Sequence, residues 1–140
     1  MPCYVVDPSV ALSWLLPDET NAAATAVRQA VEEGAEAWIP VHWWLEIGNG
    51  LLMAERRGRI KAEQVSQALS LIDSIPFEED EETAEQISGR TVALARKHGL
   101  TIYDAAYLEL AQRRGAVLAT FDEQLLKAAA KEGVSTPAKS

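Results

Sequence analysis

Four acidic residues occupy positions from which their carboxylates could act together. Asp7 directly follows the apolar residues 4–6, and Asp122 follows a second short apolar stretch. Glu46 lies in an otherwise apolar segment, and Asp104 lies at the start of a predicted helix. An unpartnered buried carboxylate is costly, so these positions favour a role that needs the charge. Converging carboxylates repel one another unless cations sit among them, and oxygen ligands suit Mg²⁺ or Mn²⁺.

Each acid also has a simpler local interpretation. Asp7 could be the turn residue that starts the first helix, and Asp122 could cap the last one. Asp104 lies three residues after Thr101, a spacing that resembles a capping box. Glu46 could lie at a partly exposed helix rim. These interpretations stay open for each residue taken alone.

Small and polar neighbours surround two of the acids. We expect Ser9 to cap the first helix through its side-chain oxygen. Asn49 lies three residues after Glu46, on the same helical face, where it could hold the carboxylate in one orientation. Gly48 and Gly50 weaken a helix, so we expect both to permit close approach of another helix or a ligand.

The elements that must position these residues follow from periodicity and from Gly and Pro punctuation. Strands are expected at 4–6, 37–39 and 117–119, with a possible edge strand at 134–136. Helices are expected at 10–16, 21–33, 41–57, 60–75, 82–97, 102–114 and 123–131. Helices that alternate with short apolar strands indicate an α/β fold with a mainly parallel sheet. Strand ends and the following helix starts share one edge of such a sheet, so all four acids can converge there.

Length and composition indicate one soluble domain spanning 1–140, with a single cysteine that cannot form an internal disulfide. The chain shows neither a signal-peptide pattern nor an apolar run long enough to span a membrane, so we expect a cytosolic protein without membrane contact. His42 and His98 are expected to be ordinary surface or helix-end residues. The helix at 41–57 is apolar on all sides, which usually indicates burial.

The charge distribution is unfavourable for binding to nucleic acid. The net charge is −8, and the acidic run 78–82 supplies five of these negatives; we expect that run to be a solvated turn. The one dense basic cluster could grip RNA or simply favour a helix C-terminus, and it comprises Arg56, Arg57, Arg59 and Lys61.

Taken together, segments 6–10, 46–49, 101–108 and 119–122 resemble PIN-domain proteins, specifically the VapC-type toxins of toxin–antitoxin pairs. The resemblance implies a three-layer α/β/α fold, Mg²⁺-dependent endoribonuclease activity, a homodimer and a cognate antitoxin. It assigns Asp7, Glu46, Asp104 and Asp122 to an acidic catalytic quartet, and Ser9, Asn49 and Thr120 to the neighbouring polar positions. Pro8 and the bulky pair Trp43 and Trp44 are less usual for the family.

The resemblance leads to a hypothesis of metal-assisted phosphodiester hydrolysis. Asp7 and Asp104 would be the principal Mg²⁺ ligands, Asp122 would complete the site or share a second ion, and Glu46 would bind that ion or orient water. Ser9 and Thr120 would position water or phosphate. Two alternatives remain: a receiver-like Mg²⁺-binding signalling domain and a non-catalytic PIN-fold adaptor.

Excess apolar residues predict a protein partner. More of them occur in two helices than one packing face can bury, namely Trp14, Leu15, Leu16, Trp43, Trp44, Leu51, Leu52 and Met53. Exposed apolar patches commonly mark interfaces. We therefore expect an amphipathic antitoxin helix to cover part of this surface, with an Arg or Lys that reaches the acids and competes with metal.

Overall fold

A four-stranded parallel sheet forms the centre of the computed structural model, which describes residues 2–137. Its strands are β1 (Cys3–Val6), β2 (Glu36–Ile39), β3 (Glu78–Glu79) and β4 (Val117–Ala119), in the order β3-β2-β1-β4. Val5 pairs with Trp38 on one side and with Leu118 on the other. The possible strand at 134–136 is wrong, because no ladder forms there; the backbone N–H of Leu118 donates to the carbonyl of Ser135 over 2.8 Å.

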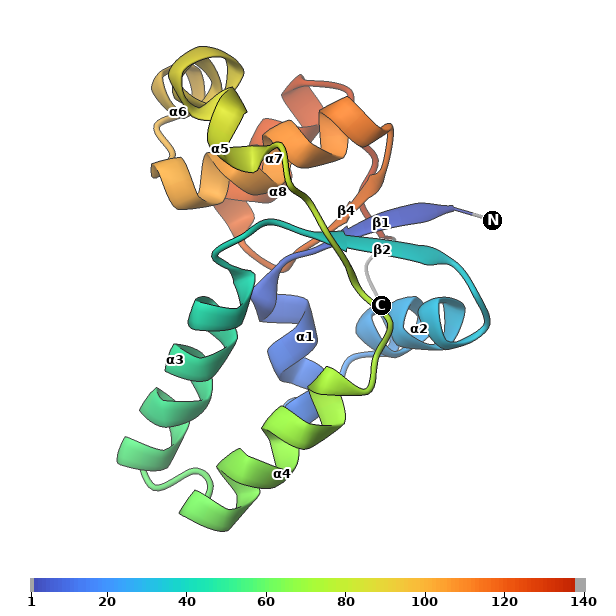
Figure 1. The fold of residues 1–140 in the computed structure, drawn as a ribbon, viewed down its shortest axis with the longest axis vertical. Helices are drawn as coiled ribbons and strands as arrows, with labels where there is room; N and C mark the ends of the chain where they lie inside the picture. Colours follow the sequence, from blue (N-terminus) through green and yellow to red (C-terminus); the bar gives the residue numbers. More distant parts are fainter. Residues whose placement is uncertain (1, 138–140) are drawn as a thin grey trace.

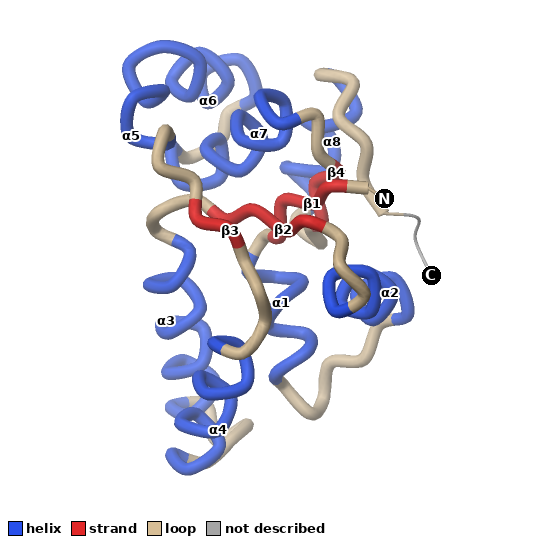
Figure 2. The backbone as a smooth tube through the Cα atoms, turned by 45° about the vertical axis from the view of Figure 1, so that its right-hand side comes forward, coloured by secondary structure: helices blue, strands red, loops and turns tan. Residues whose placement is uncertain are grey.

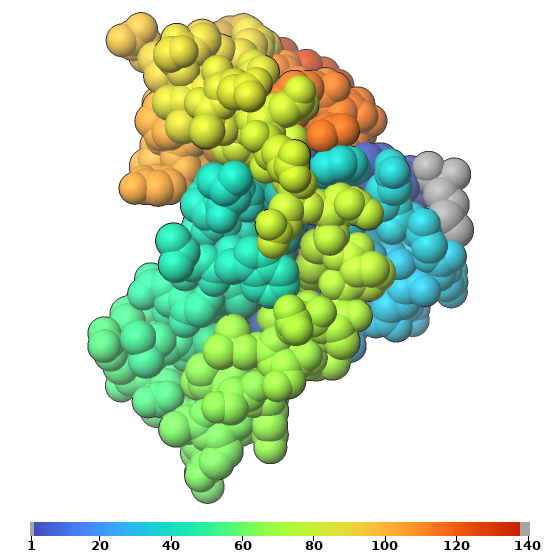
Figure 3. All heavy atoms as spheres, in the orientation of Figure 1, coloured from blue at the N-terminus to red at the C-terminus, as the bar shows by residue number. Residues whose placement is uncertain are grey.

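Helices cover both faces of this sheet, which confirms the three-layer α/β/α architecture (Figures 1 and 2). One layer holds α1 (Pro8–Leu15), α2 (Ala22–Glu32), α3 (Trp43–Arg56) and α4 (Ala62–Asp73). The other holds α5 (Thr83–Gln86), α6 (Val92–His98), α7 (Ile102–Arg114) and α8 (Glu123–Lys131). The far ends of α3 and α4 project away from the rest of the molecule (Figure 3).

Side-chain caps fix where several helices begin. Asp7, rather than Ser9, caps α1: its carboxylate accepts the N–H of Ser9, and Pro8 occupies the first helical position. The prediction that Ser9 is the cap is therefore wrong by two residues, because Pro8 has no N–H to offer and favours an earlier helix start. Thr101 caps α7 by accepting the N–H of Asp104, and Asp122 caps α8 by accepting the N–H of Leu125.

The core lies on both sides of the sheet. On one side α7 is buried continuously along residues 105–111, several of them alanines that let the helix lie close to the strands. On the other side Trp43 is fully buried, and its indole N–H donates to the carbonyl of Val6 over 2.8 Å. This bond ties the start of α3 to the end of β1, where Asp7 follows.

Two glycines in α3 behave differently. A Cβ on Gly50 would lie 2.6 Å from Leu12 Cδ1, so this glycine permits the close approach of α1 and α3. Gly48 has no neighbour within 4 Å of such a Cβ. The prediction that another helix approaches closely is therefore confirmed for Gly50 and wrong for Gly48. Burial all round α3 is also wrong, because Leu45 is 78% exposed and Leu52 is 37% exposed.

The segment 80–98 differs most from expectation. The continuous helix predicted at 82–97 is interrupted by a π-helical turn, η1 (Ile87–Thr91), between α5 and α6. The acidic run before it is not simply a solvated turn, because Asp80 is fully buried. Its carboxylate accepts hydrogen bonds from Arg113 and from Thr83. Two arginines at the end of α7 thus supply the charge that permits burial.

Among residues 2–137, no helix combines the length and the apolar character needed to cross a membrane.

Candidate active site

The sheet order places a topological switch point between β1 and β4, and we call the space outside the carboxyl ends of these two strands the crevice. The chain leaves β1 through α1 on one face, whereas β4 is reached from helices of the other face, so the two strands flank a switch point in the topology. Ligands of parallel α/β sheets bind outside the strand carboxyl ends at such points. Val6 pairs with Ala119, and the N–H of Asp7 donates to the carbonyl of Ala119 over 2.9 Å. Asp7 and Thr120 are therefore the first residues beyond the two strand ends.

Asp7 is held rigidly at this crevice. Its Oδ2 accepts hydrogen bonds from Ser9 N (3.1 Å), Ser9 Oγ (2.6 Å) and Thr120 Oγ1 (3.2 Å). Ser9 Oγ also accepts the N–H of Phe121, and Thr120 Oγ1 accepts the N–H of Asp122. These bonds link the ends of β1 and β4, and they are consistent with the prediction that Ser9 and Thr120 lie beside the acids. Oδ1 of Asp7 makes no hydrogen bond within residues 2–137.

Burial is the main cause of an unusual pKa at Asp7. Desolvation and the nearby charge of Glu46 raise the pKa of the Asp7 carboxyl to about 6, although hydrogen bonds from Ser9 and Thr120 act in the opposite direction. A carboxylate that is hard to ionise gains free energy when a cation is placed beside it.

Glu46 projects from the first turn of α3 toward α7. Its Oε1 accepts the hydroxyl proton of Tyr107 over 2.5 Å and lies 3.2 Å from His42 Nε2. Burial and the charge of Asp104 raise the pKa of Glu46, and the Tyr107 hydrogen bond opposes this rise. Asn49 does not hold this carboxylate; it is exposed and forms no hydrogen bond to Glu46, because Tyr107 and His42 occupy that role.

Asp104 and Asp122 complete the acidic group from the other helical layer. Burial raises the pKa of Asp104, and the charge of Asp122 raises it further. Each of three acids thus has its pKa raised by the charge of another. Glu46 acts on Asp7, Asp104 acts on Glu46, and Asp122 acts on Asp104. Four segments of the chain thus bring these carboxylates close enough to shift the pKa values of their neighbours.

Little positive charge balances the acids. Within residues 2–137, no Lys or Arg forms an ion pair with any of the four, and His42 is the one basic side chain beside them. Burial lowers the pKa of His42, so its ring stays neutral at physiological pH. As the side chains stand, no three Asp, Glu, His or Cys residues of the described chain are grouped so that they hold an ion. The donor chemistry, all carboxylate and hydroxyl oxygen, suits a hard cation such as Mg²⁺ or Mn²⁺.

The basic cluster lies elsewhere. Arg56 is ten residues beyond Glu46 on α3, about 15 Å along the helix axis. Arg59 forms ion pairs with Asp18 and Glu19, at 2.7 and 2.8 Å, so two carboxylates already neutralise its charge. The structure does not bring this cluster to the acids.

Two residues beside the acids were not predicted to lie there: Tyr107 was not singled out, and His42 was expected to be an ordinary surface or helix-end residue. Tyr107 lies three residues after Asp104, on the same face of α7, a spacing that could have indicated it. His42 lies four residues before Glu46 and packs edge-on against Tyr107, with ring centroids 5.2 Å apart. Both contacts join residues more than 60 positions apart in α3 and α7, which local pattern does not reveal.

Comparisons with known sequences place the chain in a family. A family model described as PIN domain matches residues 4–131. Ribonuclease VapC3 of Pyrobaculum aerophilum is 31% identical over 121 residues, which cover 86% of this chain and 90% of that protein. Ribonuclease VapC3 of Mycobacterium tuberculosis is 31% identical over 125 residues, covering 89% and 85% of the two chains.

Solved structures show the same fold. PAE2754 from Pyrobaculum aerophilum matches with a TM-score of 0.64 and 27% identity, over 96% of this chain and 83% of that one. VapBC2 from Rickettsia felis, bound to a DNA fragment from its promoter, matches with a TM-score of 0.69 and 14% identity, over 99% of both chains. FitAcB from Neisseria gonorrhoeae matches at 0.64 with 18% identity, over 96% of both chains. The last two likenesses concern the fold alone.

Proposed function

The chain belongs to the PIN-domain family, on its VapC branch, and from this premise we propose that it is a metal-dependent endoribonuclease toxin. Its substrate is RNA, its cofactor is Mg²⁺ or Mn²⁺, and a cognate antitoxin restrains it. The observation that carries this proposal is the group of four carboxylates at the β1–β4 crevice. No Lys or Arg of the described chain forms an ion pair with any of them. Relatives named as ribonucleases support the reaction class.

The receiver-like alternative does not fit the topology. Receiver-type sheets follow the order 2-1-3-4-5, whereas this sheet follows β3-β2-β1-β4. A non-catalytic adaptor would gain nothing from four mutually repelling acids, since replacing one with an amide would relieve the repulsion.

Three of the acids and two hydroxyl side chains have different proposed roles in cation binding. Asp7, Asp104 and Asp122 would hold the cation, which when bound supplies counter-charge for the acids and acts as a Lewis acid toward the phosphoryl oxygens. Ser9 and Thr120 fix the orientation of Asp7 through Oδ2 and leave Oδ1 available.

Glu46 is placed for proton chemistry. The Tyr107 hydroxyl holds its Oε1, and burial keeps its pKa raised, so it can orient a water molecule and accept a proton from it. His42 lies beside the same oxygen, with its Nε2 3.2 Å from Glu46 Oε1.

The partner proposal rests on the relatives in solved complexes. A toxin–antitoxin complex from Klebsiella pneumoniae shares this fold. We propose that this chain likewise binds an antitoxin, that it forms a homodimer, and that an antitoxin Arg or Lys enters the acidic crevice.

Replacing single acids tests the proposed activity. Asp7→Asn and Asp104→Asn should each abolish cleavage of RNA in Mg²⁺ or Mn²⁺ while the protein stays folded, because the amide removes a ligand charge and also relieves repulsion. Cleavage would be followed on total cellular RNA by end mapping, with chelator as the metal-free reference. Asp73→Asn, an exposed change at the end of α4, removes the same charge away from the site and should leave cleavage intact.

Metal binding is measured separately by melting. A ligand that binds the folded state alone stabilises it, by about 2.7 kcal/mol at a hundredfold excess over Kd. Millimolar Mn²⁺ should therefore raise the melting temperature of the wild type and should have a smaller effect on Asp7→Asn. Wild-type cleavage by either acid variant, or a melting temperature insensitive to Mn²⁺, would overturn the ligand assignment.

A further inference from the structure

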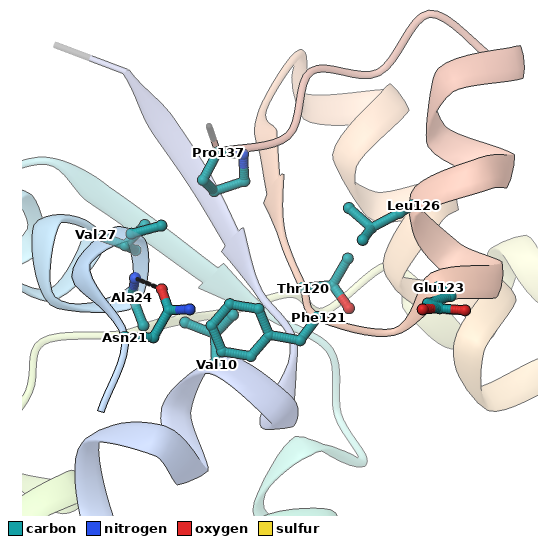
Figure 4. Close-up of a pocket in the computed structure, with 10 residues that line it drawn as sticks. Val10, Asn21, Ala24, Val27, Thr120, Phe121, Glu123, Leu126 and Pro137 are labelled. Atoms are coloured by element: carbon teal, nitrogen blue, oxygen red, sulfur yellow. Dashed lines mark hydrogen bonds between the residues drawn. The ribbon is translucent and has the colours of Figure 1, made fainter. Parts of the chain in front are cut away.

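A cavity of about 260 Å³ opens beside the acids, between α1, α2 and the β4–α8 connection (Figure 4). Val10, Val27 and Leu126 supply apolar walls. Its volume is below the roughly 300 to 1,000 Å³ of pockets that enclose drug-sized ligands. The cavity therefore suits a small, flat group rather than a long chain.

Polar groups and one aromatic ring line the same cavity. Asn21 caps α2 through Oδ1, which accepts the N–H of Ala24, while its amide nitrogen makes no hydrogen bond within residues 2–137 and points toward Phe121 (Figure 4). Phe121 is 38% exposed, so part of its ring surface is accessible to a ligand. Glu123 adds a carboxylate acceptor. The cavity thus offers an apolar surface, a donor and an acceptor.

The cavity and the acidic crevice share a wall. Thr120 lines the cavity and also donates to Oδ2 of Asp7, and the backbone N–H of Phe121 donates to Ser9 Oγ. A group seated in the cavity is therefore the immediate neighbour of whatever is bound at Asp7.

The charges of the residues that line the cavity favour a nucleobase over a phosphate as its occupant. Among the described residues 2–137, no Lys or Arg lines the cavity, and Glu123 is negative, so these residues disfavour a phosphate. A nucleobase is uncharged, stacks on aromatic rings, and presents donors and acceptors at its edge. Carboxylates accept hydrogen bonds from exocyclic amino groups, whereas an amide nitrogen donates to ring nitrogens or carbonyls.

We propose that this cavity binds one base of the RNA, next to the phosphodiester that is cleaved at the acids. Phe121 stacks on the base, Asn21 donates to its edge, and Glu123 accepts from an exocyclic amino group, so adenine, cytosine and guanine are preferred over uracil at this position. This inference rests on the proposed ribonuclease function and adds a source of sequence preference to it.

The test combines substrate and protein changes. After the cut sites of the wild type are mapped on total RNA, a series of short oligonucleotides spanning one site is made, each with a single abasic nucleotide. Base stacking on an aromatic residue corresponds to a factor between about 5 and 160 in binding. At one position the abasic change should lower kcat/KM by a factor in this range. Phe121→Ala should cause a similar loss on the intact RNA and almost no further loss on that abasic RNA.

Matched variants separate the cavity from general effects. Ile87→Ala removes an apolar side chain of similar exposure from η1, distant from the crevice, and should respond to abasic RNA as the wild type does. Glu123→Gln should reduce the ratio of kcat/KM for RNA with an amino-bearing base to that for RNA with uracil at this position. Glu85→Gln, which removes a negative charge from α5, should leave this ratio unchanged. Asn21→Ser retains a helix-capping oxygen and removes the amide donor, so it should weaken the preference without unfolding α2.

Each outcome decides the inference. Equal responses of wild type and Phe121→Ala at every abasic position would overturn it, and so would a Phe121→Ala variant that loses antitoxin binding but keeps wild-type cleavage. If the wild type cleaves no RNA, the proposed function fails, and the cavity is tested alone by NMR titration of the metal-free protein with millimolar adenosine and cytidine. Shifts at Phe121 and Leu126 would then support base binding, and unchanged spectra would overturn it.

Discussion

Asp7 serves both the local structure and the site. It caps α1, and it presents a buried carboxylate whose pKa burial raises to about 6. The cap interpretation and the site interpretation of this residue are therefore compatible, since Oδ2 takes the cap and hydroxyl hydrogen bonds while Oδ1 stays available. Asp122 also caps a helix: its Oδ1 accepts the N–H of Leu125 at the start of α8.

The raised pKa of Asp7 predicts a pH-dependent gain of stability for Asp7→Asn in metal-free protein. The folded wild type binds the Asp7 proton more tightly than the unfolded chain, so its stability falls as pH rises from 3.8 through about 6. Asparagine keeps a capping oxygen and does not titrate. Asp7→Asn should therefore match the wild type near pH 4 and exceed it above pH 7 by up to about 3 kcal/mol.

Urea unfolding in chelator at several pH values measures this difference. Asp73→Asn provides the exposed control and should stay within about 0.5 kcal/mol of wild type. A constant offset between Asp7→Asn and wild type from pH 4 to pH 8 would contradict the prediction.

Tyr107 is the second residue whose replacement is informative. Tyr107→Phe removes the hydroxyl that donates to the charged form of Glu46, so the pKa of Glu46 should rise further. The acid limb of the pH–rate profile of RNA cleavage should move to higher pH. Stability should fall by about 1 kcal/mol, because water can partly replace the donor at a carboxylate whose side chain is 35% exposed.

Tyr103→Phe is the matched control, since the Tyr103 side chain is 64% exposed. It should leave the pH–rate profile unchanged. If both variants shifted the profile equally, the Tyr107 hydrogen bond would not be the cause.

At the level of elements, β3 depends on α7 for its position. β3 is only two residues long, and Asp80 directly after it is tied to Arg113 at 2.8 Å and to Arg114 at 3.3 Å. Arg114 also lies over the ring of Trp38 in β2, 3.5 Å from its centroid. An ionic cluster thus holds the edge of the sheet against the helix that carries Asp104.

Asp80→Asn should destabilise the protein by about 3 kcal/mol, near the lower end for breaking a buried pair, because Arg113 keeps Glu109 as a partner. Although burial would raise the pKa of Asp80, the hydrogen bonds from Arg113 and Thr83 hold it well below its ordinary value. The contribution of Asp80 is therefore present above about pH 4 and is lost as pH falls further.

Chemical unfolding at pH 7 and at pH 3 checks this prediction. Glu81→Gln changes an exposed neighbour and should have little effect at either pH. An equal loss of stability in both variants would show that the acidic run acts only through its overall charge.

The sequence predicted best those elements whose ends carry their own signals. α7, β4 and α8 agree with prediction to the residue, because Thr101, Gly115 and Asp122 mark their boundaries. The break at η1 and the burial of Asp80 were missed, since the arginines that neutralise Asp80 lie 33 and 34 residues away. The four acids were found from spacing and resemblance, whereas the contacts of Tyr107 and His42 depend on how α3 meets α7.

For the whole molecule, the exposed apolar surface agrees only in part with the prediction: Leu52 is 37% exposed, whereas Trp43 and Leu51 are fully buried. Trp14 is partly internal: its indole N–H donates to the carbonyl of Ala24, and its ring stacks on Phe77. Trp44 is half-buried, and Leu45 beside it is 78% exposed. The start of α3 therefore combines an exposed apolar side chain with the edge of the acidic crevice.

We expect an antitoxin helix to cover this region and to compete with metal. Trp44→Ala should weaken the complex with the product of the adjacent gene by about 1 to 2 kcal/mol, as for a typical interface hot spot. Trp14→Ala should reduce stability as well as binding, since that ring supports α2. Co-expression, pull-down and titration with Mn²⁺ measure both effects, with Ile87→Ala on the opposite layer as control. Binding that is insensitive to Trp44→Ala and to Mn²⁺ would contradict the interface.

The pairing of β1 with β4 also sets when the crevice can exist during synthesis. Thr120 holds Asp7 across a separation of 113 residues, so the first acid leaves the ribosome long before the strand that completes its surroundings. At 5 to 20 residues per second, this interval is about 6 to 23 s. A nascent chain therefore lacks the assembled acids until the segment after β4 emerges. Under the proposed function, an antitoxin already present in the cell would meet the chain at the moment when the acids come together.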